Sequence, residues 1–214
     1  MRPLSRVALV CSGVAALLAA TAAAQDPRLD RLTPEARAPV ATLLDSARTA
    51  GLPVEPLLQR ALEGTTKRAA PELVVAAVRR LAADLGRARS ALGFRASPAE
   101  LAAGAAALRA GAPAEVLVAL RRSRPNPLTV PLAVLTDLVA SGVPVDSATA
   151  AVLALATRAR DADLVEFRRA VERDIALGAS PGAAVSTDAI GFLGPSAISV
   201  PGPHGHQSSQ PTRP

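Results

Sequence analysis

The chain has 214 residues, half of them hydrophobic, which is enough for one domain with a packed core and argues against bulk disorder. It contains no Trp or Tyr and only three Phe, so its core must consist of Leu, Val and Ala, a composition that favours helices over strands. The net charge of +6 would suggest nucleic acid as a partner, but basic and acidic residues alternate and aromatic residues for base stacking are scarce, so we expect no nucleic-acid binding.

Residues 1–24 predict a secretory signal peptide. Two arginines precede an uncharged stretch over residues 7–20, and Ala22 and Ala24 are the small residues that a signal peptidase recognises. We therefore expect cleavage after Ala24 and an exported protein, either periplasmic or extracellular. The alternative is an uncleaved membrane anchor at the N-terminus, although the apolar stretch is short against the ~20 residues of a membrane span.

One local pattern repeats through residues 34–185, which we predict to form an all-α domain after a short linker at 25–33. A small or capping residue is followed by Pro, then by an acid, then by apolar residues at helical spacing. Pro and an acid both suit the first turn of a helix, and Gly suits the position just after its last turn. The predicted helices cover residues 34–50, 54–63, 71–92, 98–110, 113–122, 131–141, 145–158, 161–177 and 181–185.

The turn signals predict how these helices connect. Ser97 and Glu100 have the spacing of a capping box, in which each side chain satisfies the backbone N–H of the other residue. A Gly-x-Pro-x-acid motif recurs at uneven intervals, so we expect consecutive antiparallel hairpins rather than a strict repeat. Whether they form an array or a compact bundle stays open. The glycines that we expect to mark helix ends are Gly51, Gly64, Gly93, Gly111, Gly142 and Gly178.

Two helices carry an apolar stripe that should face the core. In both, apolar residues recur at alternating intervals of three and four positions. The stripes are formed by Val74, Val78, Leu81, Leu85, Ala88 and Leu92 in one helix and by Leu164, Phe167, Val171 and Ile175 in the other.

The C-terminal residues 186–214 are rich in Gly, Pro and Ser and predict a disordered tail. This tail holds both histidines, His204 and His206, and two ligands without a third do not make a metal site. The single cysteine, Cys11, lies in the predicted signal peptide. We therefore expect no metal and no disulfide in the mature protein.

The predicted helical domain lacks the residues for most catalytic mechanisms. Without His or Cys it cannot build a Ser-His-Asp triad or a thiolate nucleophile, and it has no glycine-rich phosphate-binding loop. We predict that the protein is not an enzyme and has no cofactor. A carboxylate-dependent envelope hydrolase is the remaining catalytic alternative. Asp137 stands alone in an apolar stretch, and a pair with a nearby Arg or a polar edge shared with Ser141 is the favoured interpretation over a functional acid.

Arg121, Arg122 and Arg124 form a basic cluster beside a connection that contains three prolines. Positive side chains at the end of a helix already complement its dipole, and this is the favoured interpretation. The alternative is a guanidinium fork that binds phosphate or carboxylate, on an anionic lipid or an acidic partner.

These observations together favour a non-enzymatic helical interaction or scaffold module of the cell envelope, acting on another envelope protein or on a second copy of itself. The alternative function is a carrier of a small apolar or lipid ligand between the helices. An exposed, arginine-lined groove would favour the interaction module, whereas an enclosed apolar cavity would favour the carrier.

Overall fold

The computed structural model describes residues 26–125 and 127–194, and this part of the chain is all-helical, as predicted. A short 3-10 helix, Pro27–Arg31, precedes the α-helices. The predicted signal peptide, with Ala22 and Ala24, lies outside the described residues. Over the described part the α-helices are α1 (Pro34–Thr49), α2 (Glu55–Thr66), α3 (Pro71–Leu92), α4 (Pro98–Arg109), α5 (Ala114–Ser123), α6 (Thr129–Ala140), α7 (Val145–Ala156), α8 (Asp161–Ala176) and α9 (Pro181–Leu193).

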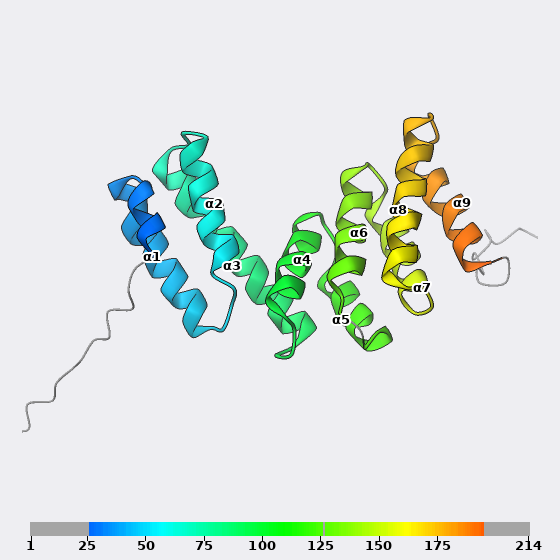
Figure 1. Ribbon diagram of the computed structural model, residues 1–214, viewed down its shortest axis with the longest axis horizontal. Helices are drawn as coiled ribbons and strands as arrows, with labels where there is room; N and C mark the ends of the chain where they lie inside the picture. The colour runs from blue at the N-terminus through cyan, green and yellow to red at the C-terminus, as the bar shows by residue number, and fades with distance from the viewer. Residues whose placement is uncertain (1–25, 126, 195–214) are drawn as a thin grey trace, which may run out of the picture.

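The helices form an elongated two-row array and not a compact bundle. Helices α1, α3, α5, α7 and α9 make one row in which each packs on the next, and α4, α6 and α8 continue in the same way in a second row. Figure 1 shows the helices following one another along the long axis, from α1 at one end to α9 at the other. Each helix contacts only its near neighbours, so the hydrophobic core extends as one continuous strip along the array, as in helical solenoids.

The Gly-x-Pro-x-acid motif forms the turns between several helices. Gly111 and Gly142 adopt positive φ angles of 103° and 89°, which L-residues with a side chain rarely adopt. The next residue then donates a backbone hydrogen bond to a carbonyl five positions back, as Val143 N–H does to the Leu138 oxygen at 3.0 Å. This hydrogen bond satisfies a carbonyl at the helix end, and the Pro that follows starts the next helix.

Gly64 is an exception, because the prediction that it ends a helix is wrong. Helix α2 continues to Thr66, and Arg68 occupies the left-handed turn position with φ of 55°. Gly64 instead permits close packing of α2 on α3, since a Cβ atom added there would lie 2.8 Å from Cγ2 of Val74. Glycine is therefore required at position 64 by the close contact with α3 and not by its own backbone conformation.

Both ends of the helical domain extend further than the sequence indicates. The predicted linker at 25–33 contains the 3-10 helix, which buries Leu29. The prediction of disorder from residue 186 is wrong for residues 186–193, because α9 extends to Leu193. Its Ala184 and Ala189 are buried, and its Phe192 ring packs edge-on against Phe167 with the ring centroids 5.7 Å apart. Packing onto α7 and α8 stabilises a segment whose composition alone predicts no helix.

The two predicted apolar stripes face the core. All six stripe residues of α3 are buried, and three of the four in α8 are buried while Ile175 is half-buried. Phe167 is the largest fully buried side chain in the described residues. None of the helices in residues 26–194 combines the length and the apolar character that a membrane span requires.

Candidate binding site at the α3–α4 turn

The three arginines of the predicted cluster do not form a common site. Arg124 is 5% exposed and pairs with Asp161, which links the end of α5 to the start of α8. Arg121 is half-buried and pairs with Glu100 on α4 at 2.5 Å. Arg122 is exposed and has no ion pair within the described residues. Two of the three guanidinium groups therefore connect helices to one another, and they point in different directions.

Asp137 forms an ion pair with an arginine. Its carboxylate accepts a hydrogen bond from Arg168 Nη1 on α8 at 2.6 Å, and its side chain is 42% exposed. The Ser141 hydroxyl donates to the Asp137 backbone oxygen at 3.0 Å. The acid thus connects α6 to α8, in agreement with the structural interpretation of this residue.

Glu100 is the carboxylate with the most hydrogen bonds in this region. Its Oε2 accepts the backbone N–H of Ser97 at 2.8 Å, and the Ser97 hydroxyl accepts the Glu100 N–H at 3.2 Å, so the predicted capping box is confirmed. Its Oε1 accepts the backbone N–H of Leu128 at 2.9 Å and Arg121 Nη2 at 2.5 Å. One buried side chain thus caps α4, holds the start of α6 and orients an arginine from α5.

These contacts determine the ionisation of Glu100. Burial by itself would raise its pKa, but the hydrogen bonds from the Ser97 and Leu128 N–H groups and from Arg121 outweigh burial and lower the pKa to about 2. The carboxylate is therefore ionised at neutral pH and has few lone pairs left for a substrate. A general acid or base needs a pKa near the working pH, so Glu100 is poorly suited to that role.

The turn between α3 and α4 presents two side chains to solvent. Gly93 has φ of 83°, and the Ala96 N–H donates to the Gly93 oxygen at 3.2 Å, so Phe94 and Arg95 occupy the tip of the turn. Buried Leu92 and Ala96 hold the turn on either side. Phe94 is 93% exposed. A fully exposed aromatic ring on a turn held in this way indicates a contact surface, because loops on a rigid scaffold commonly carry binding residues.

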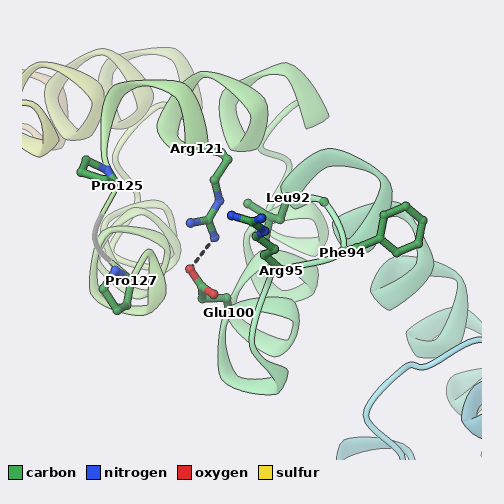
Figure 2. Close-up of a pocket in the computed structure, with 8 residues that line it drawn as sticks. Leu92, Phe94, Arg95, Glu100, Arg121, Pro125 and Pro127 are labelled. Atoms are coloured by element: carbon green, nitrogen blue, oxygen red, sulfur yellow. Dashed lines mark hydrogen bonds and ion pairs between the residues drawn. The ribbon is translucent and has the colours of Figure 1, made fainter.

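A hollow of about 450 Å³ lies beside this turn and is open to solvent. Figure 2 shows the Arg95 guanidinium lying next to that of Arg121 inside the hollow, while the Phe94 ring points away from it. Two guanidinium groups face one carboxylate, which leaves the hollow with an excess of positive charge. Its lining is completed by proline side chains; the full set is Leu92, Gly93, Phe94, Arg95, Glu100, Arg121, Pro125 and Pro127.

This arrangement can hold an anionic group but offers no evident reaction chemistry. Arg95 is exposed, has no ion pair among the described residues and presents its donors toward the hollow. A carboxylate or phosphate oxygen placed between the two guanidinium groups would gain charge-assisted hydrogen bonds. Within residues 26–194 no group of three or more His, Cys, Asp or Glu side chains could hold a metal ion.

Of the residues around the hollow, Arg121 is among those that the sequence predicts as a site, whereas Phe94 and Arg95 are not. The signal was present: these residues lie between a helix-ending glycine and a helix-capping serine, which leaves them at the tip of a short turn. An aromatic residue at such a position, in a chain with only three Phe, is the sequence signal for this surface. The sequence predicts only the capping-box role of Glu100, because its hydrogen bonds with Leu128 and Arg121 join segments that are distant in sequence.

No protein-family model, no curated protein and no solved structure matches this chain. The function must therefore be argued from the surface itself: the exposed turn, the adjoining hollow and the ion pairs that hold them.

Proposed function

We propose that the mature protein is an exported, non-enzymatic interaction module of the cell envelope, which binds another envelope protein through the α3–α4 turn. The observation that carries this proposal is Phe94, 93% exposed at the tip of a well-anchored turn and flanked by Arg95. Aromatic residues and arginine are the types that most often dominate the binding energy of protein interfaces.

The energetics support a contact of this kind. Burying an exposed Phe side chain gives roughly 2–3 kcal/mol. Leu92 and Ala96, both buried, already hold the turn, so little conformational entropy is lost on binding. Arg95 can add a charge-assisted hydrogen bond to a partner carboxylate. Phe94 would supply affinity, and Arg95 with Arg121 would select an acidic group next to the apolar anchor.

The lining of the hollow favours this function over the carriage of a small apolar ligand. The space beside the turn is open and carries charged groups, whereas carrier cavities are enclosed and mostly apolar. Export is supported by the basic start, the apolar stretch and the small residues at Ala22 and Ala24. A second copy of the chain is the other partner that this surface could serve.

Native mass spectrometry of the protein, tagged and gently extracted from the envelope of its own cells, tests the proposal. The expected spectrum contains the chain cleaved after Ala24 with one protein partner at fixed stoichiometry. The variant Phe94→Ala/Arg95→Ala should lose the partner. The matched control is Leu73→Ala/Arg79→Ala, which removes an exposed apolar residue and an exposed arginine from elsewhere on α3.

The possible outcomes separate the proposed function from its alternatives. A partner that survives the Phe94→Ala/Arg95→Ala substitution, or one that the control loses equally, would contradict the proposed surface. A small added mass without any protein would indicate a carried ligand. If the protein forms a homodimer that the Phe94→Ala/Arg95→Ala substitution abolishes, the α3–α4 turn is still the binding surface, and the partner is a second copy of the chain.

A further inference from the structure

A groove runs between α2 and α4, at the place where the second row of helices is interrupted. Helix α4 packs on α6, and α6 on α8, but α2 does not pack on α4 in this way. Both α2 and α4 pack instead on α3, the longest helix, which passes beneath them. Figure 1 shows α2 and α4 set apart along the array, with α3 running between them.

Side chains leave this interval hollow. Two adjoining spaces of about 350 and 630 Å³ share Arg60 of α2, Leu81 of α3 and Arg109 of α4. The groove is therefore bounded by α2 on one side and α4 on the other, with α3 as its floor. None of its lining residues belongs to the Phe94 hollow, so it is a separate surface.

The rim of the groove is basic. Four arginines line the two spaces, and two of them are paired: Arg60 with Glu63 at 3.1 Å and Arg87 with Asp84 at 2.7 Å. The remaining two, Arg80 and Arg109, are exposed and have no ion pair within the described residues. The groove thus carries a surplus of positive charge that a partner of opposite sign would neutralise.

The floor and the adjoining part of the α4 wall are apolar. Leu81 of α3 is 7% exposed and borders both spaces, while the half-buried Ala77 of α3 borders one of them and the half-buried Ala102 of α4 borders the other. Alanine lets the backbone of an incoming segment approach closely. The walls are helices whose backbone hydrogen bonds are already made, so an extended strand would find no edge to pair with. An amphipathic helix lying in an apolar groove is the recognition mode that suits this geometry.

We propose that an acidic amphipathic helix of a partner polypeptide docks between α2 and α4 and occupies the place of a helix in the second row. Its apolar face covers Ala77, Leu81 and Ala102, and its carboxylates pair with Arg80 and Arg109. The complementary charges bring the helix to the groove and orient it there, and the apolar floor provides the contact area. This site is independent of the contact proposed at Phe94.

The test uses a fluorescein-labelled synthetic peptide as the probe and the full chain as the receptor. The peptide carries Leu and Ala at alternating intervals of three and four residues, with Glu at the remaining positions. Its control has the same apolar residues and Lys in place of every Glu. Fluorescence anisotropy should detect the Glu peptide in the micromolar range and no binding of the Lys peptide. Binding should weaken about tenfold at 0.5 M salt, where exposed charges are screened.

Three variants locate the site. Arg80→Glu/Arg109→Glu should weaken binding of the Glu peptide more than about tenfold, because it reverses both unpaired charges. Arg122→Glu/Arg158→Glu makes the same change in net charge at exposed arginines outside the groove, and should change affinity less than about twofold. Ala102→Phe fills the groove from its α4 wall without changing charge, and it should also weaken binding more than about tenfold. Circular dichroism of each variant confirms that the helical fold is retained.

Several results would overturn this proposal. The Lys peptide could bind as well as the Glu peptide, the Arg122→Glu/Arg158→Glu control could lose as much affinity as the groove variant, or Ala102→Phe could bind normally. Vesicles of phosphatidylglycerol that bind through Arg80 and Arg109, when the Glu peptide does not, would assign the groove to an anionic membrane instead. Loss of peptide binding on Phe94→Ala/Arg95→Ala, with the groove variants unaffected, would move the site to the turn.

Discussion

The α4–α6 interval lies within the second row of helices and the α2–α4 interval lies at the start of that row, yet the first is closed and the second is open. At the closed interval, Glu100 on α4 accepts the Leu128 N–H at the start of α6, and the apolar faces of the two helices meet. At the open interval, long charged side chains such as Arg60 and Arg109 line both walls. The helices themselves are built from the same sequence pattern on both sides of α4.

The array is therefore regular in its helices and irregular in the contacts between them. A row closes where small and apolar side chains face each other and where a buried polar group finds all its partners. It stays open where like charges would have to be desolvated against one another. Breaking the closed interval should therefore cost stability, whereas removing an exposed charge at the open interval should change stability little.

The largest effect is expected from Glu100→Ala. This substitution leaves the Ser97 and Leu128 N–H groups and Arg121 without their shared acceptor, and it should lower the free energy of unfolding by about 3 kcal/mol. The control is Asp137→Ala, which removes a more exposed carboxylate that pairs with Arg168 and should cost less than about 1 kcal/mol. Urea unfolding followed by circular dichroism measures both, and equal losses would contradict the role given to burial.

A smaller effect of about 2 kcal/mol should follow from pH. Because folding lowers the pKa of Glu100 from 4.5 to about 2, the stability that it contributes is fully present above pH 4.5 and is lost as the pH falls toward 2. The free-energy gap between wild type and Glu100→Gln should therefore shrink by about 2 kcal/mol between pH 6 and pH 3. The other carboxylates titrate in both proteins, so their contributions cancel in the difference between the two free energies of unfolding. Parallel pH profiles would show that the pKa of Glu100 is not lowered.

Two glycines should respond in opposite directions to the same substitution. Gly64→Ala places a methyl group 2.8 Å from Val74 Cγ2, where a short β-branched side chain cannot move aside. Overpacking should outweigh the gain in helix propensity, for a net loss of about 1 kcal/mol. Gly86→Ala meets no atom within 4 Å and should stabilise α3 by about 0.5–1 kcal/mol. Thermal unfolding of both variants measures the difference, and a stabilised Gly64→Ala would refute the close contact.

The smallest effect is expected at the turn between α2 and α3. Arg68 holds a positive φ of 55° that glycine adopts without strain. Arg68→Gly should raise the free energy of unfolding by about 0.5 kcal/mol, the relief of strain being partly offset by the greater freedom of glycine in the unfolded chain. The control is Arg31→Gly, because Arg31 does not have a positive φ angle, and this substitution should not stabilise the protein. The midpoint of urea unfolding distinguishes the two.

Much of the fold could be predicted because its signals are local. The repeated Pro and acid mark helix starts, and glycines such as Gly93 and Gly142 mark helix ends, so the helix bounds agree closely with the structure. The errors arose where tertiary contacts outweigh local signals. Gly64 is a packing glycine inside a helix, and α9 continues past residue 185 because α7 and α8 cover its apolar face.

The site was harder to predict than the fold. The charge of Arg121 is evident in the sequence, but Arg122 lies on another face of α5, and Arg124 lies just past the end of α5 with an extended backbone. Neither of them lines the hollow. Glu100 and Leu128 are far apart in the chain, and nothing in either local sequence indicates the hydrogen bond between them. The basic groove likewise combines residues of α2, α3 and α4, each of which is an unremarkable surface arginine in its own helix.

By itself the sequence determined the fold class, most of the helix bounds and the buried faces of α3 and α8, because helix propensity, capping and the 3.6-residue period act over only a few residues. The tertiary structure alone decided that the helices form an open two-row array, that Glu100 joins three of them and that a basic groove separates α2 from α4. Those outcomes depend on which side chains meet across long separations, where volume, desolvation and hydrogen-bond satisfaction determine whether two helices close or stay apart.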